Sequence, residues 1–280
     1  MRRAAHTSWG GIVARRSGSV GAREWCAAPS PGPVLAYGNG RSYGDSCLID
    51  DGTFLDTSEL DRIVSLDADI GLVVCEAGVM LGNLLETCVP RGWFVPVTPG
   101  TRFVTMAGAV ANDVHGKNHH ALGTIGRHIA WLDLVRSDGQ MLRCSRTRNG
   151  ALFKATIGGM GLTGLITRLA LQLVPIKGPF MSQDTLPFAG LDGFFDIATQ
   201  SDATHDYTVA WIDSLATGAG LGRGVFFRAN HSGKPGSEAA HAAKPLPLLP
   251  FMPPVPLLNR LTLRVFNAAT ALSTVGQRPA

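Results

Sequence analysis

Short apolar segments separated by Gly and Asp turns recur along the first 175 residues, and this pattern predicts strands. The clearest lie at 34–37 (VLAY), 62–66 (RIVSL) and 71–79 (GLVVCEAGV). The Asp138–Gly139 pair divides a longer apolar stretch into two halves, as in a β-hairpin. A further long strand is predicted over 161–176.

Helical periodicity is local. Residues 105–113 (TMAGAVAND) are small and predict a short, tightly packed helix, and Asn149 could cap a helix through 151–157. Residues 80–88 predict an amphipathic helix whose apolar face is formed by Met80, Leu81, Leu84, Leu85 and Cys88. Because the strands come in groups and do not alternate strictly with helices, the predicted fold class is α+β.

The composition changes after Pro175, which predicts two domains, 1–175 and 176–280. The second domain contains one helix candidate, at 190–200, and two strand candidates, at 207–215 and 222–230. Residues 232–258 are rich in Pro, Gly and Ala and are expected to be flexible. Their apolar part, PLPLLPFMPPVPLL, is open to three interpretations: a flap near the substrate, a peripheral membrane contact, or a disordered loop.

The overall composition is that of a globular enzyme, with a mean hydropathy of +0.14 and a net charge of +4. The basic residues are too dispersed to predict nucleic-acid binding. The five cysteines contain no CxxC pair and are interpreted as free thiols in a reducing compartment. Because the chain contains neither a secretory signal pattern nor a long uninterrupted apolar run, a cytoplasmic location is expected.

The glycine-rich stretch GNGRSYGD (38–45) follows the first predicted strand. Its spacing, Gly38-x-Gly40-x-x-x-Gly44, is one residue too long for a dinucleotide fingerprint, and strand-like residues follow where that motif needs a helix. It also lacks the Gly-Lys-Ser/Thr of a P-loop. Two interpretations remain from these residues alone: a backbone nest for anionic oxygens, or an ordinary surface turn.

A second glycine-rich segment, residues 98–128, brings several titratable side chains together at HGKNHH. His115 and His119 have the i, i+4 spacing of a zinc site, but Gly116 and Asn118 disfavour the helix that such a pair needs. No metal site is therefore expected. The histidines could bind a ligand or be ordinary surface residues.

A third glycine-rich turn, TIGGMGLTGLI (156–166), precedes the long predicted strand. Three such segments in a mixed α+β chain suggest one extended ligand that passes several stretches of backbone. A long dinucleotide such as FAD fits this pattern better than a mononucleotide.

GNGRSYGD, PGTRFVTMAGAVANDVHGKNHH and IGGMGLTGLI, in this order, resemble the FAD-binding domain of the vanillyl-alcohol-oxidase type. Within that type they are similar to the decaprenylphosphoryl-ribose 2'-oxidase family. The resemblance extends over residues 8–230 and implies FAD as the cofactor. Some relatives attach FAD covalently through a histidine in the first loop; Arg41 stands at that position, so non-covalent FAD is expected.

The resemblance also implies roles for individual residues. Lys117, His115 and Tyr43 would form the catalytic group at the flavin, and Trp211 would contact substrate. His115 could assist proton removal or only hydrogen-bond the flavin, and the second role is favoured. The residues implied to bind FAD are Gly38, Asn39, Gly40, Arg41, Ser42, Tyr43, Gly44, Asp45, Ser46, Gly100, Thr105, Met106, Ala107, Gly108, Asn112, Asp113, His115 and Ile166.

The implied reaction is oxidation of the 2'-hydroxyl of a polyprenyl-phosphoryl ribose to a ketone, by hydride transfer to flavin N5. The implied partners are this lipid-linked sugar and an NAD-dependent reductase that would act on the keto product. Two alternatives stay open: an FAD-binding remnant without turnover, and a sugar oxidase of the aldonolactone-oxidase type. Members of the family extend beyond the position that matches Ala280, so this chain is expected to be a fragment, a frameshifted product or a degenerate copy.

Overall fold

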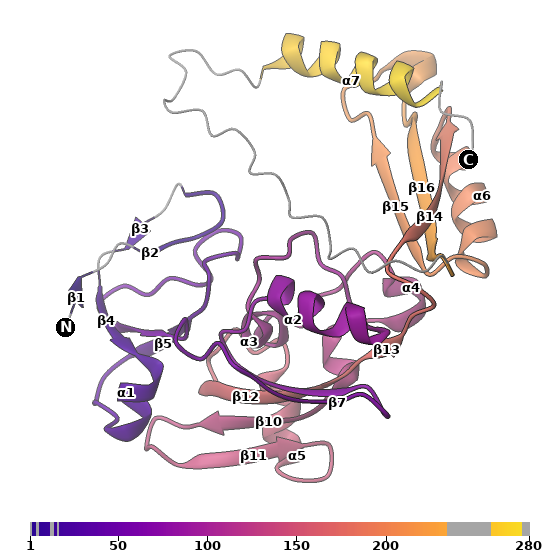
Figure 1. The fold of residues 1–280 in the computed structure, drawn as a ribbon. Helices are drawn as coiled ribbons and strands as arrows, with labels where there is room; N and C mark the ends of the chain where they lie inside the picture. The colour runs from indigo at the N-terminus through magenta and orange to yellow at the C-terminus, as the bar shows by residue number, and fades with distance from the viewer. Residues whose placement is uncertain (1, 4–5, 12–13, 16, 234–258, 276–280) are drawn as a thin grey trace. The chain divides into compact units, whose positions relative to one another are not determined.

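The computed structural model describes residues 2–3, 6–11, 14–15, 17–233 and 259–275, which form an α+β fold (Figure 1). The chain divides into two compact units, Met1–Ile176 and Lys177–Ala280, and each is described by itself. The boundary drawn from the sequence after Pro175 lies one residue from this division. The apolar Pro-rich stretch 245–258 lies outside the described residues.

The first unit begins with a four-stranded sheet that presents the glycine loop. Its order is β1 (Arg2–Arg3), β4 (Gly18–Gly21), β6 (Thr53–Asp56) and β5 (Val34–Tyr37). Strands β4, β6 and β5 run parallel, whereas β1 is antiparallel to β4. Helix α1 (Ala22–Ala27) follows β4 directly, and β2 (His6–Thr7) pairs with β3 (Ala14–Arg15). The predicted strand at 34–37 is confirmed, and it ends where GNGRSYGD starts.

A five-stranded antiparallel sheet forms the core of the first unit. Its order is β11 (Met141–Ser145), β10 (Ile129–Val135), β12 (Leu165–Gln172), β8 (Leu72–Glu76) and β7 (Ile63–Asp67). The predicted hairpin is confirmed: Gly139, at φ +82°, closes the turn between β10 and β11. The fully buried side chains of this sheet include Val73, Leu132, Leu134, Leu169 and Leu171.

Short helices surround this sheet. They are α2 (Leu81–Cys88), α3 (Met106–Ala111), α4 (His119–Leu122) and α5 (Gly150–Thr156). Two 3₁₀ turns, η1 (Val89–Arg91) and η2 (Ile125–His128), lie between them. A separate short pair is formed by β9 (Trp93–Phe94) and β13 (Val174–Pro175). Helix α3 packs on β8 and β12. The predicted helices are confirmed, but Asn149 does not cap α5 with its side chain. It has φ +52°, and its amide donates to the Arg143 carbonyl at 2.9 Å.

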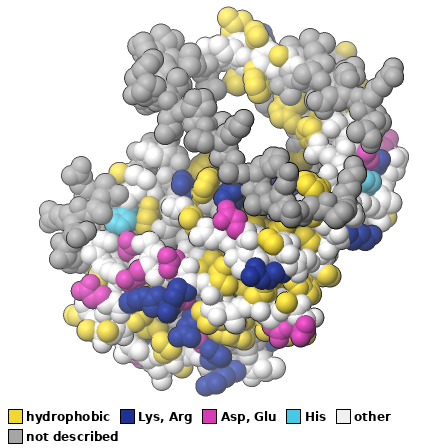
Figure 2. Space-filling model, viewed as in Figure 1, with side chains coloured by type: hydrophobic (Ala, Val, Ile, Leu, Met, Phe, Trp, Pro, Cys, Tyr) yellow, Lys and Arg dark blue, Asp and Glu magenta, His cyan; other side chains and the backbone are white. Residues whose placement is uncertain are grey.

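The second unit contains a three-stranded antiparallel sheet and two helices. The sheet order is β14 (Met181–Phe188), β16 (Gly224–His231) and β15 (Tyr207–Ile212). Helix α6 (Leu191–Asp202) covers one face, where the Phe194 ring lies 5.9 Å from that of Phe226. The remaining elements are η3 (Gly218–Gly220) and α7 (Arg260–Val275). Hydrophobic side chains are exposed over the beginning of α7, at the top of Figure 2.

The helix and both strands predicted for the second unit are confirmed, but β14 was not predicted. Its sequence, MSQDTLPF, is mostly polar and contains a proline, which is typical of a turn. The strand forms because it lies at the sheet edge and pairs along its whole length with β16. Pairing with a distant segment therefore outweighed the local preference.

Candidate functional site

A cavity of about 510 Å³ lies in the first unit, and all three glycine-rich segments contribute to its wall. This volume falls within the range of small-molecule and cofactor sites. The following predicted FAD-binding residues are on the wall: Gly38, Asn39, Gly40, Arg41, Ser42, Tyr43, Ser46, Gly100, Thr105, Ala107, Gly108, Asn112, His115 and Ile166. The predicted residues Gly44, Asp45, Met106 and Asp113 are not on it.

The loop after β5 is shaped by close backbone approaches. Gly40 has φ +59°, and a Cβ placed there would collide with the Thr7 carbonyl and the Tyr37 hydroxyl. That hydroxyl in turn donates to the Thr7 carbonyl at 2.7 Å. A Cβ at Gly38 would lie 2.5 Å from Thr105 Oγ1. Glycine is therefore needed at both positions, because the loop could not otherwise lie against these neighbours.

The backbone N–H groups of this loop have a distinctive property. No residue that the structure describes accepts a hydrogen bond from the N–H of Gly38, Asn39, Gly40 or Arg41, although Gly40 is buried. Buried backbone donors almost always have a partner. Successive unpaired N–H groups in a glycine turn form a concave site for anionic oxygens. The loop thus has the donor set that a diphosphate requires.

The start of helix α3, by contrast, is already saturated. The Met106 and Ala107 N–H groups donate to the carbonyls of Val79 and Ala77, at 2.8 and 3.0 Å. The Gly108 N–H donates to Thr105 Oγ1 at 3.3 Å. These residues were expected to help hold the cofactor, but the backbone N–H groups of Met106, Ala107 and Gly108 are not available to an anion.

Arg41 supplies the permanent charge on the described cavity wall. Its guanidinium lies 5.4 Å from the ring centre of Trp9 and 5.7 Å from that of Phe103, distances at which aromatic rings attract a cation. The backbone N–H of Trp9 donates to the Ser42 carbonyl at 3.0 Å, and the side-chain amide of Asn39 donates to the Phe103 carbonyl at 2.9 Å. Both aromatic residues are thereby tied to the loop that carries Arg41.

Within HGKNHH, the structure separates side chains that the sequence places together. Gly116 lies against the backbone of Thr98, where a Cβ would be 2.6 Å from the nitrogen. The buried Asn118 amide donates to the Pro96 carbonyl at 2.6 Å. With the segment fixed in this way, His115 is on the cavity wall, whereas Lys117 is exposed and not on the wall.

The histidines of this segment form no helical pair, because α4 begins only at His119 and His115 precedes it. The His115 and His119 rings lie edge to face at 5.8 Å. Among the residues with described positions, no group of three or more metal-ligating side chains occurs.

Asp113 was expected at the cofactor but is engaged elsewhere. Its backbone has φ +41°, and its carboxylate accepts a hydrogen bond from the Gly126 N–H at 2.9 Å. This bond joins the end of α3 to η2. The side chain therefore fixes the segment that carries His115 and does not face the cavity.

Sequence reasoning missed several wall residues, chiefly Trp9, Cys47 and Met160. Trp9 carries no local signal, since it reaches the wall only through its backbone bond to Ser42. Cys47 was assigned to the general set of free thiols, and burial raises its pKa. Met160 lies within the third glycine-rich turn, at φ +54°, and its N–H donates to the Ala111 carbonyl at 2.8 Å.

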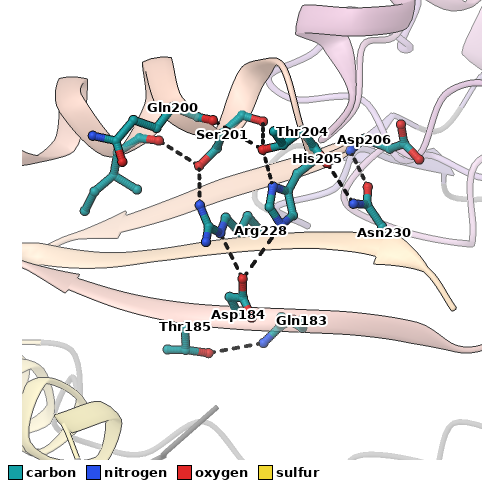
Figure 3. Close-up of polar contacts among 11 residues, drawn as sticks. Gln183, Asp184, Thr185, Gln200, Ser201, Thr204, His205, Asp206, Arg228 and Asn230 are labelled. Carbon is teal, nitrogen blue, oxygen red and sulfur yellow. Dashed lines mark hydrogen bonds and ion pairs between the residues drawn. The ribbon is translucent and has the colours of Figure 1, made fainter. Parts of the chain in front are cut away.

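Trp211, the expected substrate contact, is half-buried on β15 of the second unit. The polar groups on the α6 side of that sheet are paired with each other (Figure 3). Asp184 accepts a hydrogen bond from Arg228 at 3.0 Å and lies 3.7 Å from the His205 ring nitrogen. Arg228 also donates to Ser201 of α6 at 3.4 Å. This cluster joins the helix to the sheet, which is a structural role.

Comparison with known proteins matches residues 10–145 to the family described as FAD binding domain. The chain is 38% identical to decaprenylphosphoryl-β-D-ribose oxidase of Mycolicibacterium smegmatis, over 70% of this chain and 43% of that protein. It is also 38% identical to an uncharacterized protein of Streptomyces coelicolor, over 64% of this chain and 48% of the relative.

A more distant match is a putative D-arabinono-1,4-lactone oxidase of Neurospora crassa, 29% identical over 51% of this chain and 25% of the relative. The chain spans less than half the length of each of these relatives. The matched region includes the open N–H groups, Arg41 and most of the cavity wall. Residues 10–145 therefore match an FAD-binding domain, and the cofactor is FAD.

Proposed function

We propose that the chain is an FAD-dependent oxidoreductase, or the FAD-binding part of one, that oxidises a secondary alcohol on a sugar. The observation that carries the proposal is the loop Gly38–Arg41, with its unpaired N–H groups and one cation at a cavity of cofactor size. The proposed substrate is a polyprenyl-phosphoryl ribose, oxidised at its 2'-hydroxyl to a ketone. The similarity to decaprenylphosphoryl-β-D-ribose oxidase supports this choice.

The proposed binding of FAD is non-covalent. The loop N–H groups and the Arg41 guanidinium would hold the diphosphate, because both are donors without an anionic partner among the described residues. The loop presents no histidine that could form a covalent link. Trp9 and Phe103 hold the guanidinium in place and reduce the entropy that Arg41 would lose on binding.

When bound, FAD supplies the hydride acceptor at its flavin N5. His115 is on the cavity wall and can donate to or accept from the reacting hydroxyl or the flavin edge. Lys117 lies two residues further and is not on the wall, so its proposed role requires its long side chain to reach over to that edge, where the ammonium would stabilise negative charge. Tyr43 is on the wall with an exposed ring and would contact substrate.

A flavin spectrum tests the cofactor site. Arg41→Met is expected to weaken FAD binding about 10- to 100-fold, the usual worth of a charge-assisted hydrogen bond. Arg148→Met is the matched control, because Arg148 is exposed and not on the cavity wall. Equal FAD affinity in both variants would contradict the role of Arg41.

Anaerobic mixing with a polyprenyl-phosphoryl ribose tests the reaction. The expected result is loss of the oxidised flavin absorbance, with Lys117→Ala abolishing this loss while FAD stays bound. A flavin that stays oxidised would favour a binding remnant. Reduction by an aldonolactone instead would favour the second candidate, for which the match to the lactone oxidase is the supporting observation. An NAD-dependent reductase is the proposed partner for the keto product, since a ketone intermediate requires a reducing step.

A further inference from the structure

Helix α7 is amphipathic in the opposite sense to an ordinary surface helix. Asn267 is only 8% exposed, and its amide donates to Asp213 at 2.6 Å, at the end of β15. Leu261 and Val265 are 72% and 65% exposed. At 3.6 residues per turn, Val265 and Asn267 point about 200° apart. Asn267 therefore faces the protein, whereas Leu261 and Val265 face outward.

This orientation is fixed by a buried polar anchor. Asp213 is 3% exposed and accepts hydrogen bonds from Arg223 at 2.8 Å and from the Leu215 N–H at 3.1 Å, as well as from Asn267. Rotating α7 to bury Leu261 and Val265 would break the bond between Asn267 and Asp213 and leave the buried Asn267 amide without this acceptor, which is costly for a buried group. The outward apolar stripe is thus a consequence of the packing of α7 on the sheet.

Two cations lie on one side of the stripe, since at 3.6 residues per turn Arg264 is about 60° and Arg260 about 100° from Leu261. Arg260 and Arg264 are exposed, and neither has an ion-pair partner among the described residues. The sequence from Ala239 to Ala280 contains no Asp or Glu. Figure 2 shows the hydrophobic side chains over the beginning of this helix. An apolar face with arginines along one side and no acidic residues has the composition of helices that lie in the interface of an anionic membrane.

We propose that α7 is a docking surface for a lipid bilayer with anionic headgroups. Leu261 and Val265 enter the interface, while Arg260 and Arg264 contact phosphate groups. A second copy of the chain fits less well, because the two stripes would bring four arginines together without a counter-charge. No helix in the described part of the chain could cross a membrane, so the contact is peripheral.

Vesicle flotation with the full chain tests this proposal. The chain is expected to float with vesicles of equal parts phosphatidylglycerol and phosphatidylcholine, and not with phosphatidylcholine alone. Leu261→Glu with Val265→Glu should reduce the bound fraction at least about tenfold, since it places charge in the apolar face. Arg260→Gln with Arg264→Gln should remove most of the dependence on anionic lipid and on salt.

The matched control is Met141→Glu with Ile70→Glu, which adds the same two charges at side chains that are 60% and 56% exposed in the first unit. This control should bind vesicles like the parent chain.

The proposal is overturned if the α7 variant floats as well as the control. It is also overturned if the parent chain forms a dimer that the α7 variant loses, which would identify a second copy as the occupant. Flavin content should stay unchanged in all variants, so this result is independent of the proposed oxidoreductase activity.

Discussion

The loop after β5 and the polar anchor of the second unit use hydrogen-bonding groups in opposite ways. At the loop, four successive N–H groups have no acceptor among the described residues. At the anchor, Asp213 is bonded to Arg223, Asn267 and Leu215. Proteins pair nearly all buried polar groups, so the unpaired N–H of the buried Gly40 next to a cavity indicates a surface prepared for a ligand. The paired set indicates a part whose role is to hold the fold together.

Substitution of Gly40 should have the largest effect, because it breaks the loop itself. Gly40→Ala places a Cβ against Thr7 and Tyr37 at positive φ. We expect a loss of about 3 kcal/mol in the free energy of unfolding and no retained flavin. Urea unfolding and the visible spectrum measure the two effects.

Gly44→Ala separates backbone conformation from crowding in the same loop. Gly44 also has positive φ, +60°, but a Cβ there would meet no atom within 4 Å. The expected cost is about 1–2 kcal/mol, with flavin retained. Equal behaviour of the two variants would mean that the close approach at Gly40 does not shape the cofactor site.

Removal of Asp213 should have the next largest effect on the free energy of unfolding and should leave the cofactor site intact. Asp213→Ala removes the acceptor for Arg223 and Asn267, and the expected loss is about 2 kcal/mol of unfolding free energy. The bound flavin should be unchanged at temperatures where the chain is folded. A drop in FAD affinity of the folded protein would show that the two units do not have separate roles.

Acid should weaken both units through one buried carboxylate in each. Burial acts to raise the pKa of Glu76 and of Asp213, but hydrogen bonds from arginines outweigh it, so both pKa values are lowered. Such groups stabilise the fold above their unfolded-state pKa, near 4, and lose that contribution as the pH falls through the folded-state pKa. Urea unfolding should show constant stability between about pH 5 and 7 and a decline below about pH 4.

The variant Glu76→Gln with Asp213→Asn provides the comparison for this titration. It should be less stable than the parent at pH 7 and should show a shallower decline in acid. An unchanged acid slope would mean that other carboxylates are responsible.

The smallest expected effect concerns Thr105, which caps α3 on the cavity wall. Thr105→Val removes the acceptor of the Gly108 N–H, and the expected cost is about 1 kcal/mol. Thr105→Ser keeps the hydroxyl and should restore most of this stability. A large loss of FAD in Thr105→Val alone would show that the hydroxyl contacts the cofactor and does more than cap the helix.

The sequence by itself determined the α+β class, most strands and helices, and the three glycine-rich segments. Local chemistry sufficed there, because glycine density, Asp–Gly turns and apolar runs act within a few residues. The same reasoning failed for β14, whose pairing partner β16 is distant in the sequence, and for Asn149, whose amide binds Arg143 instead of capping α5.

Only the tertiary structure decided which polar groups are open and which are occupied. It paired the Met106 and Ala107 amides with the carbonyls of Val79 and Ala77, just after β8. It directed Asp113 to Gly126 and left the Gly38–Arg41 amides without an acceptor among the described residues. It also brought Trp9 beside Arg41 and turned the apolar stripe of α7 outward. The physical reason is the same in each case: a hydrogen-bonding group or an apolar face is satisfied by whatever segment folds next to it, and that neighbour is far away in the chain.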